Sequence, residues 1–169
     1  MRLKKTLFLS MLLAISVVLA AVESLIGFNH IPGVKLGLAN VIIVLLLYEF
    51  SFKDAFIISI LRVFIVSFIL GKFLMPQFYM SLFGAFFSIL IMLILKKGNK
   101  FSIIFISCIG SLFHSIGQLF ALSLFFNEML TFYYLPIMGM LSMITGIVIG
   151  LIAKRVILHY HAFFNNIEN

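Results

Sequence analysis

The sequence is poor in acidic residues, in cysteine and in recognisable catalytic motifs. Its 169 residues include one cysteine, Cys108, so no disulfide can form within the chain. Asp54 is the only aspartate, and the four glutamates stand in separate segments, which offers no metal site. A phosphate-binding loop ending in Lys-Ser or Lys-Thr, which would bind ATP, is also missing. If the activity of the protein requires energy, another protein must therefore supply it. We therefore expect no catalytic residue, no metal and no cofactor, and the balance is against an enzyme.

Charge of either sign is scarce as well. Charged residues make up 10% of the chain and hydrophobic residues 64%, which excludes a water-soluble globular domain. The composition indicates an integral membrane protein surrounded by a lipid bilayer. The net charge of +7 does not indicate a nucleic-acid partner, because the lysines and arginines stand in short clusters between apolar runs. Such clusters are typical of polytopic membrane proteins.

The apolar runs predict an all-α integral membrane protein, a bundle of about six transmembrane helices that forms a single transmembrane domain over residues 1–169. The expected helices cover residues 6–27, 36–49, 53–71, 78–95, 101–126 and 135–153. The second is short for a full crossing, so either the segment before it lies within the membrane or protein shields the helix. A cleaved signal peptide ending at Ala20 is the alternative for the first run, but this run stays apolar beyond Ala21.

The distribution of basic residues predicts the orientation. With the N-terminus inside, the inner segments hold Arg2, Lys4, Lys5, Lys53, Lys96, Lys97, Lys100, Lys154 and Arg155, whereas the outer turns hold Lys35 and Lys72. Cytoplasmic loops of membrane proteins are enriched in Lys and Arg. Both termini are therefore expected in the cytoplasm, and a cavity between the helices would open to the outside.

Residues 28–40, reading FNHIPGVKLGLAN, gather proline, glycine and polar residues inside an otherwise apolar sequence. A loop that enters a helix here would direct backbone N–H groups, the helix dipole and the Lys35 ammonium toward one point. This arrangement suits a polar or anionic ligand, and Lys35 and Asn40 are candidate binding residues. A plain interhelical turn is the alternative, because proline and glycine mark turns in general.

Arg62 stands near the middle of the third expected helix. A charge at this depth costs several kcal/mol unless it is solvated or paired, so Arg62 is expected to face the bundle interior or a wet cavity. A salt bridge is the structural alternative. Its nearest candidate acid, Glu23, is expected about 10 Å from the level of Arg62 by helix rise.

The fifth expected helix has a small and polar side. Ser107, Ser111 and Ser115 repeat every four residues, and Gly110, His114 and Gln118 repeat one step behind them. His114 lies at a depth similar to that of Arg62, so His114 and Gln118 are candidate binding residues in a shared cavity. The alternatives are tight helix packing for the serines and a satisfied core position for the histidine.

Two further patterns of small residues predict close helix packing. Ser16, Ala20 and Ser24 share one face of the first helix and form a seam for a partner helix, inside the chain or in another subunit. Gly146 and Gly150 form a GxxxG motif in the sixth helix.

The sequence resembles the bacterial Gx transporter family, which is also labelled heptaprenyl diphosphate synthase component I. The resemblance covers about residues 10–155 and rests on the string PGVKLGLAN at Pro32–Asn40, on Arg62, and on Ser111–Gln118 with its His-x-x-Gly-Gln ending. The family usually has Asn at the position of Ser115. It is similar in turn to the substrate-binding S components of energy-coupling factor transporters, which are small six-helix membrane proteins.

The resemblance implies two functions. The first is a solute-binding or transport component for a small anionic molecule, which works with a coupling membrane subunit and ATPases; the seam at Ser16, Ala20 and Ser24 would then meet the coupling subunit. The second is a non-catalytic membrane accessory of polyprenyl diphosphate synthesis for quinones, with a soluble polyprenyl synthase as its partner. The chain itself lacks the Asp-rich motifs that would hold Mg²⁺ and a diphosphate.

Overall fold

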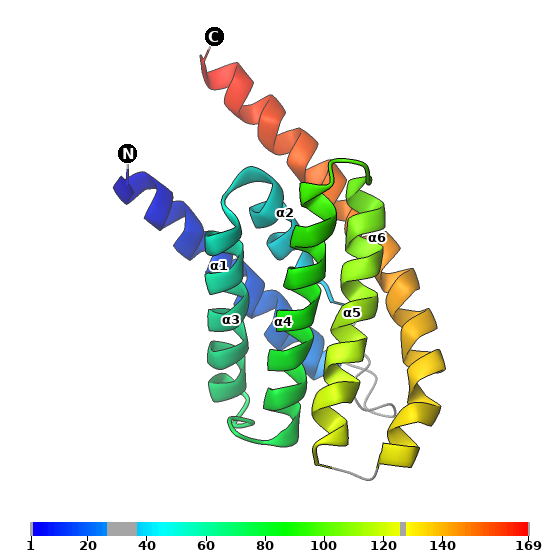
Figure 1. Cartoon of the computed structure of the whole chain (residues 1–169). Helices are drawn as coiled ribbons and strands as arrows, with labels where there is room; N and C mark the ends of the chain where they lie inside the picture. The colour runs from blue at the N-terminus through cyan, green and yellow to red at the C-terminus, as the bar shows by residue number, and fades with distance from the viewer. Residues whose placement is uncertain (1, 27–36, 126–127, 169) are drawn as a thin grey trace.

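The computed structural model describes residues 2–26, 37–125 and 128–168 of the chain. Over these residues the protein is entirely α-helical, without a strand, as the sequence predicted. In chain order the helices are α1 (Arg2–Ile26), α2 (Asn40–Glu49), α3 (Phe52–Ile69), α4 (Pro76–Lys97), α5 (Ile103–Ser123) and α6 (Glu128–Glu168). Figure 1 shows that the chain begins and ends at the same end of the helix bundle.

The short helix α2 forms the centre of the hydrophobic core. All residues from Val41 to Leu47 are buried, and they pack with core residues of α4, α5 and α6, including Ile89, Ile106 and Ile149. A helix that is apolar all round is stable only when protein or lipid covers every side. Of the two explanations for this short segment, the structure supports the one in which protein shields the helix.

Glycines allow α5 to pack closely against both of its neighbours. A Cβ atom added at Gly117 would lie 2.6 Å from the carbonyl oxygen of Phe83 in α4. One added at Gly146 in α6 would lie 2.8 Å from the Cα atom of Cys108. The predicted GxxxG motif of α6 therefore faces α5, within the same chain.

The start of α3 has a capping box. The Ser51 hydroxyl accepts a hydrogen bond from the backbone N–H of Asp54 at 3.2 Å, and the Asp54 carboxylate accepts one from the N–H of Ser51 at the same distance. Asp54 also forms an ion pair with Lys5 of α1, with an N–O distance of 2.7 Å. These contacts join α1 to α3 at the end of the bundle that holds the termini.

The largest difference from the expected helices concerns α6, which has 41 residues and begins and ends well outside residues 135–153. The expected helix began at Leu135, whereas α6 begins at Glu128 and includes Pro136 within the helix. Beyond Ala153 no glycine or proline follows that would stop the helix, so it continues to Glu168.

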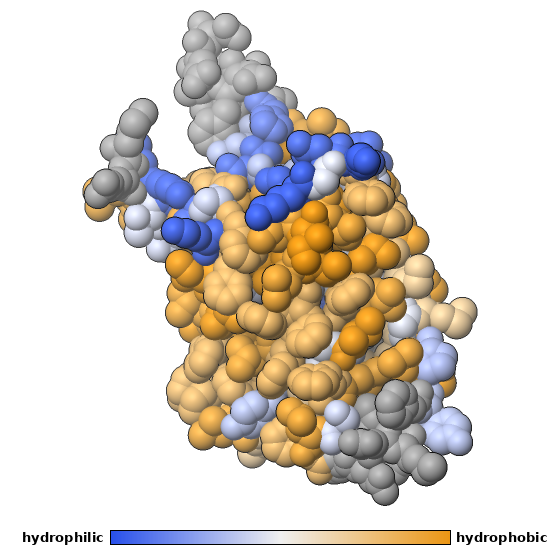
Figure 2. Space-filling view, in the orientation of Figure 1, coloured by the Kyte–Doolittle hydropathy of each residue, from blue (hydrophilic) through white to orange (hydrophobic). Residues whose placement is uncertain are grey.

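Four helices are long and apolar enough to cross a membrane, which supports a multi-pass membrane protein. The candidate spans are Leu3–Leu25, Pro76–Lys97, Ile103–Ser123 and Leu135–His161. The helix α2 is shorter, and α3 carries Lys53, Asp54 and Arg62 within 18 residues. Figure 2 shows an apolar surface over most of the visible face, with hydrophilic residues gathered at the end that holds both termini. The number of crossings and the orientation remain predictions.

Candidate functional site

Arg62 is buried in the middle of α3, with only 6% of its surface exposed. Its Nη2 atom donates a hydrogen bond to the Asn40 Oδ1 atom at 3.1 Å. Its Nη1 atom has no hydrogen-bond partner among the described residues. Leaving a buried donor without a hydrogen bond costs about 1–3 kcal/mol of folding free energy, and more when the donor is charged. A ligand or a water molecule that accepts a hydrogen bond from Nη1 would remove this cost.

The turn before α2 positions Asn40. Gly37 has a left-handed backbone with φ of +76°, and its carbonyl oxygen accepts a hydrogen bond from the Asn40 N–H at 2.8 Å. A Cβ atom at Gly37 would lie 2.9 Å from the Cδ1 atom of Ile149, so glycine suits both the conformation and the space. The Gly37 N–H donates in turn to the Glu23 Oε1 atom. The turn therefore links the acid of α1 to the amide that holds Arg62.

Glu23 and Arg62 line the same cavity, which the expected offset of about 10 Å between their levels did not suggest. That estimate treated the two helices as upright, whereas α1 crosses the bundle at an angle to α3 (Figure 1). Glu23 is buried, with 6% of its surface exposed, and it lines the cavity together with Arg62. The two side chains do not form a direct ion pair among the described contacts.

The wall formed by α5 contributes His114 and Gln118, which are one helical turn apart and share a face. Gln118 is buried, and both side chains pack over Gly84 of α4. A Cβ atom at Gly84 would lie 3.0 Å from the His114 Nε2 and Gln118 Cγ atoms, so this glycine provides the room that they occupy.

The wall formed by α6 joins α5 through hydroxyl groups. Ser115 and Ser142 share a hydrogen bond between their Oγ atoms, and Ser142 also donates to the Met138 carbonyl oxygen at 2.6 Å. Farther along the interface, the Ser107 Oγ atom donates to the Gly146 carbonyl oxygen at 2.9 Å. Ser107 and Ser115 thus take part in packing between helices, as the alternative for these serines suggested.

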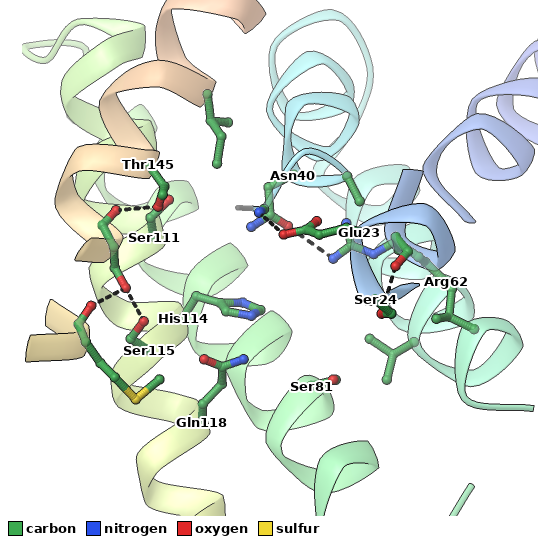
Figure 3. Close-up of a pocket in the computed structure, with 18 of the residues that line it drawn as sticks. Glu23, Ser24, Asn40, Arg62, Ser81, Ser111, His114, Ser115, Gln118 and Thr145 are labelled. Carbon is green, nitrogen blue, oxygen red and sulfur yellow. Dashed lines mark hydrogen bonds between the residues drawn. The ribbon is translucent and has the colours of Figure 1, made fainter. Parts of the chain in front are cut away.

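Together these walls enclose a cavity of about 240 Å³ that draws residues from the turn before α2 and from every helix (Figure 3). In Figure 3 His114 and Gln118 extend from α5 toward the space that Arg62 and Glu23 face from α3 and α1. Serine and threonine hydroxyls line one side, and apolar side chains such as Val63, Val66, Leu141 and Ile149 complete the lining. The site is a small mixed cavity with a cation, an anion and several neutral hydrogen-bonding groups.

Four of the five residues predicted to bind a ligand line this cavity: Asn40, Arg62, His114 and Gln118. The fifth, Lys35, lies outside the described residues. The predicted seam of α1 turns inward, because Ser16 is completely buried and Ala20 and Ser24 line the cavity. In this conformation the seam faces the protein's own helices.

Sequence reasoning did not count Glu23 as a cavity residue. The signal was present, since Glu23 is the only charged residue of α1 after Lys5. The contributions of Ser81, Ser142 and Thr145 had no comparable signal, because hydroxyls often satisfy themselves within their own helix. No group of three or more metal-ligating side chains occurs in the described part of the chain.

Comparison with known proteins gives one family match. A family model described as heptaprenyl diphosphate synthase component I matches residues 12–156, a range that contains the whole cavity. Neither the curated proteins nor the solved structures gave a match.

Proposed function

The chain belongs to the heptaprenyl diphosphate synthase component I family, and within it we propose that this protein is a membrane-embedded solute-binding component of a transporter. The observation that carries the proposal is the Arg62 guanidinium, which is buried, faces the cavity and keeps an unpartnered Nη1 atom in the described structure. A charge is retained at such depth at a cost of several kcal/mol, which favours a functional role over a structural one. The ligand we propose is small, with an anionic group that binds Arg62.

The remaining predicted residues fit this role. Asn40 holds one side of the guanidinium, and His114 and Gln118 offer neutral hydrogen-bonding groups across the cavity. Ligand sites combine apolar walls with a few well-placed polar groups, and this cavity has both. We propose Lys35, which lies outside the described residues, as the fifth binding residue.

We further propose that the whole chain is one domain in the bacterial cytoplasmic membrane, with both termini inside. Figure 1 shows the termini, the α2–α3 turn and the α4–α5 turn at one end of the bundle. Lys97 and Lys100 lie at that end, and Lys72 lies at the other. The enrichment of basic residues on cytoplasmic loops supports the orientation. Glu23 and Gln118 belong to the farther halves of their helices, so the cavity would open outward.

Transport would need a partner for energy. The sequence has no ATP-binding motif, so we propose a coupling membrane subunit with ATPases, as in the transporters whose S components this chain resembles.

Native mass spectrometry of the purified protein tests the solute-binding role. We expect a small molecule to co-purify with the wild type and to be lost in Arg62→Ala, because the variant removes the cation that holds the anionic group. Lys53→Ala is the matched control, since Lys53 is an exposed cation on the same helix, outside the cavity. This control should retain the ligand.

Retention of the same small molecule at the same occupancy in folded Arg62→Ala would contradict the proposal. Arg62→Lys separates charge from geometry: a lysine keeps the positive charge but not the planar fork, so we expect weakened rather than abolished binding.

The description of the family favours a second candidate, a non-catalytic accessory subunit of heptaprenyl diphosphate synthesis. The cavity of about 240 Å³ corresponds to about eight water molecules at about 30 Å³ each. A prenyl chain of seven isoprene units is far larger, so in this function the prenyl chain would lie in the bilayer and the exposed basic end would bind a soluble synthase.

Pull-down through a C-terminal tag distinguishes the two candidates. The accessory function predicts recovery of a soluble polyprenyl synthase, weakened when the exposed Lys97 and Lys100 are both changed to Gln. Lys96 is left unchanged because it donates to the Leu47 carbonyl oxygen and lies 5.0 Å from the Tyr48 ring centroid, so its loss would disturb packing. Recovery of ATPases and a coupling membrane protein would instead exclude the accessory function.

A further inference from the structure

The cavity contains two opposite charges that are near each other but not joined. Arg62 and Glu23 are each 6% exposed, and no direct ion pair between them occurs in the described structure. The first is held by Asn40 and the second by the Gly37 N–H, so both keep their positions without contacting each other. Their charges are therefore fixed on separate elements and both face the same cavity.

Each charge also has an atom that no described residue pairs with, and this atom is available to a ligand. Arg62 Nη1 has no hydrogen-bond partner among the described residues. Glu23 accepts a hydrogen bond at Oε1, whereas its Oε2 atom accepts none from the described part of the chain. The cavity consequently offers a cationic donor and an anionic acceptor at the same time.

The combined charge constrains the ligand. With Arg62 positive and Glu23 negative, this pair has no net charge, Asn40, Gln118 and the hydroxyl groups are neutral, and His114 is the remaining titratable group of the described lining. With His114 in its neutral form, a net anion would bring an uncompensated charge into a buried site, which is costly. A ligand that carries both charges would satisfy both side chains without changing the total.

We propose that the ligand is a small zwitterion of the amino-acid type. Its carboxylate accepts hydrogen bonds from Arg62 Nη1, its ammonium donates to Glu23, and its side chain packs against the apolar part of the lining, including Val63 and Val66. The proposal rests on the solute-binding role and narrows the anionic ligand to one with a compensating cation. The volume of about 240 Å³ suits a molecule of this size and excludes a large cofactor.

The competing possibility is a monoanion that binds after Glu23 takes up a proton. The two differ in what Glu23 does: for a zwitterion its negative charge is needed, whereas for a monoanion its neutral form is preferred. Glu23→Gln therefore separates them. Glutamine keeps an oxygen that can accept from the Gly37 N–H, so the turn before α2 keeps its hydrogen bond in this variant.

The test is the thermal stability of the purified full-length protein in detergent with each of the common L-amino acids, followed by titration of the best binder. For that amino acid, two matched analogues are tested, one without the ammonium group and one without the carboxylate. We expect the amino acid to raise the melting temperature and each analogue to bind at least tenfold more weakly. Glu23→Gln should lose at least tenfold in affinity for the amino acid.

Glu49→Gln is the matched control, because Glu49 is a carboxylate outside the cavity, 3.0 Å from the His161 ring nitrogen. It should leave the affinity unchanged. Tighter binding of the analogue without an ammonium, or unchanged affinity in Glu23→Gln, would overturn the zwitterion while the solute-binding role stands. If no amino acid binds but a small molecule lost in Arg62→Ala co-purifies, the amino-acid assignment is wrong. If no small molecule binds at all, the solute-binding role fails with it.

Discussion

Gly37 combines a left-handed backbone with a close contact, and a substitution there can test the turn that positions Asn40. A side chain in this conformation costs about 1–2 kcal/mol. Gly37→Ala also brings a Cβ atom within 2.9 Å of Ile149 Cδ1, and such overpacking adds about 1 kcal/mol or more. We expect a lower melting temperature and weaker ligand binding.

Gly71→Ala is the control for Gly37→Ala, because Gly71 has φ of +64° but no atom within 4 Å of an added Cβ. It should show the backbone cost alone. Adding Ile149→Val to Gly37→Ala removes the clashing Cδ1 atom and should restore part of the loss. Equal destabilisation by Gly37→Ala and Gly71→Ala would mean that the Ile149 contact is unimportant.

At the scale of single residues, the sequence predicted a cavity position for Arg62 and His114 but not for Glu23. An isolated cation at mid-helix has few acceptable surroundings, so its position inside the bundle follows from the cost of exposing it to lipid. The partner of a buried charge depends on how helices cross, and helix rise alone does not provide the crossing angle. The sequence therefore did not show that Glu23 and Arg62 line one cavity, although Glu23 stands out as the only charged residue of α1 after Lys5.

The packing of α6 against α5 depends on a glycine that leaves no space for a side chain. Gly146→Ala would place a Cβ atom 2.8 Å from the Cys108 Cα atom, so the backbones must separate. We expect destabilisation of about 1–3 kcal/mol in equilibrium unfolding. Gly139→Ala on the same helix is the control, because its Cβ atom would lie 3.4 Å from the flexible Leu112 Cδ1 atom.

The control Gly139→Ala should be neutral or slightly stabilising, since alanine is favoured over glycine within a helix by about 0.5–1 kcal/mol. If Gly146→Ala is equally well tolerated, the close approach of α5 and α6 is not required for stability.

The existence of the six helices followed from the apolar runs, whereas their ends and surroundings followed only in part. The start of α3 was predictable, because Ser51 and Asp54 form a local cap. The extent of α6 was not predictable, because proline does not always end a helix in membrane proteins, where neighbouring groups can satisfy the freed backbone groups. Pro136 lies within α6 in this way. The sequence left two options for the surroundings of α2. The helix is apolar on every side, and such a surface is compatible with lipid as well as with protein.

The molecule as a whole has a basic end, which predicts its orientation in the membrane. Single cysteines at the exposed positions Lys72 and Lys100 can report on the two ends after Cys108→Ala removes the natural thiol. In intact cells we expect a membrane-impermeant maleimide to label Lys72→Cys but not Lys100→Cys. Permeabilised cells should allow labelling of both, and labelling of Lys100→Cys alone in intact cells would reverse the proposed topology.

The central position of α2 also determines when the protein can finish assembling during synthesis. Its 10 residues span about 15 Å, half of a hydrocarbon layer of about 30 Å, so it cannot cross the bilayer alone. Its core partners include Ile149, Ala153 and Ile157 of α6, which leaves the ribosome after α2, α3, α4 and α5. The helix α2 therefore reaches its final surroundings only after α6 has been made, and nascent chains that stop before α6 should be unable to retain ligand.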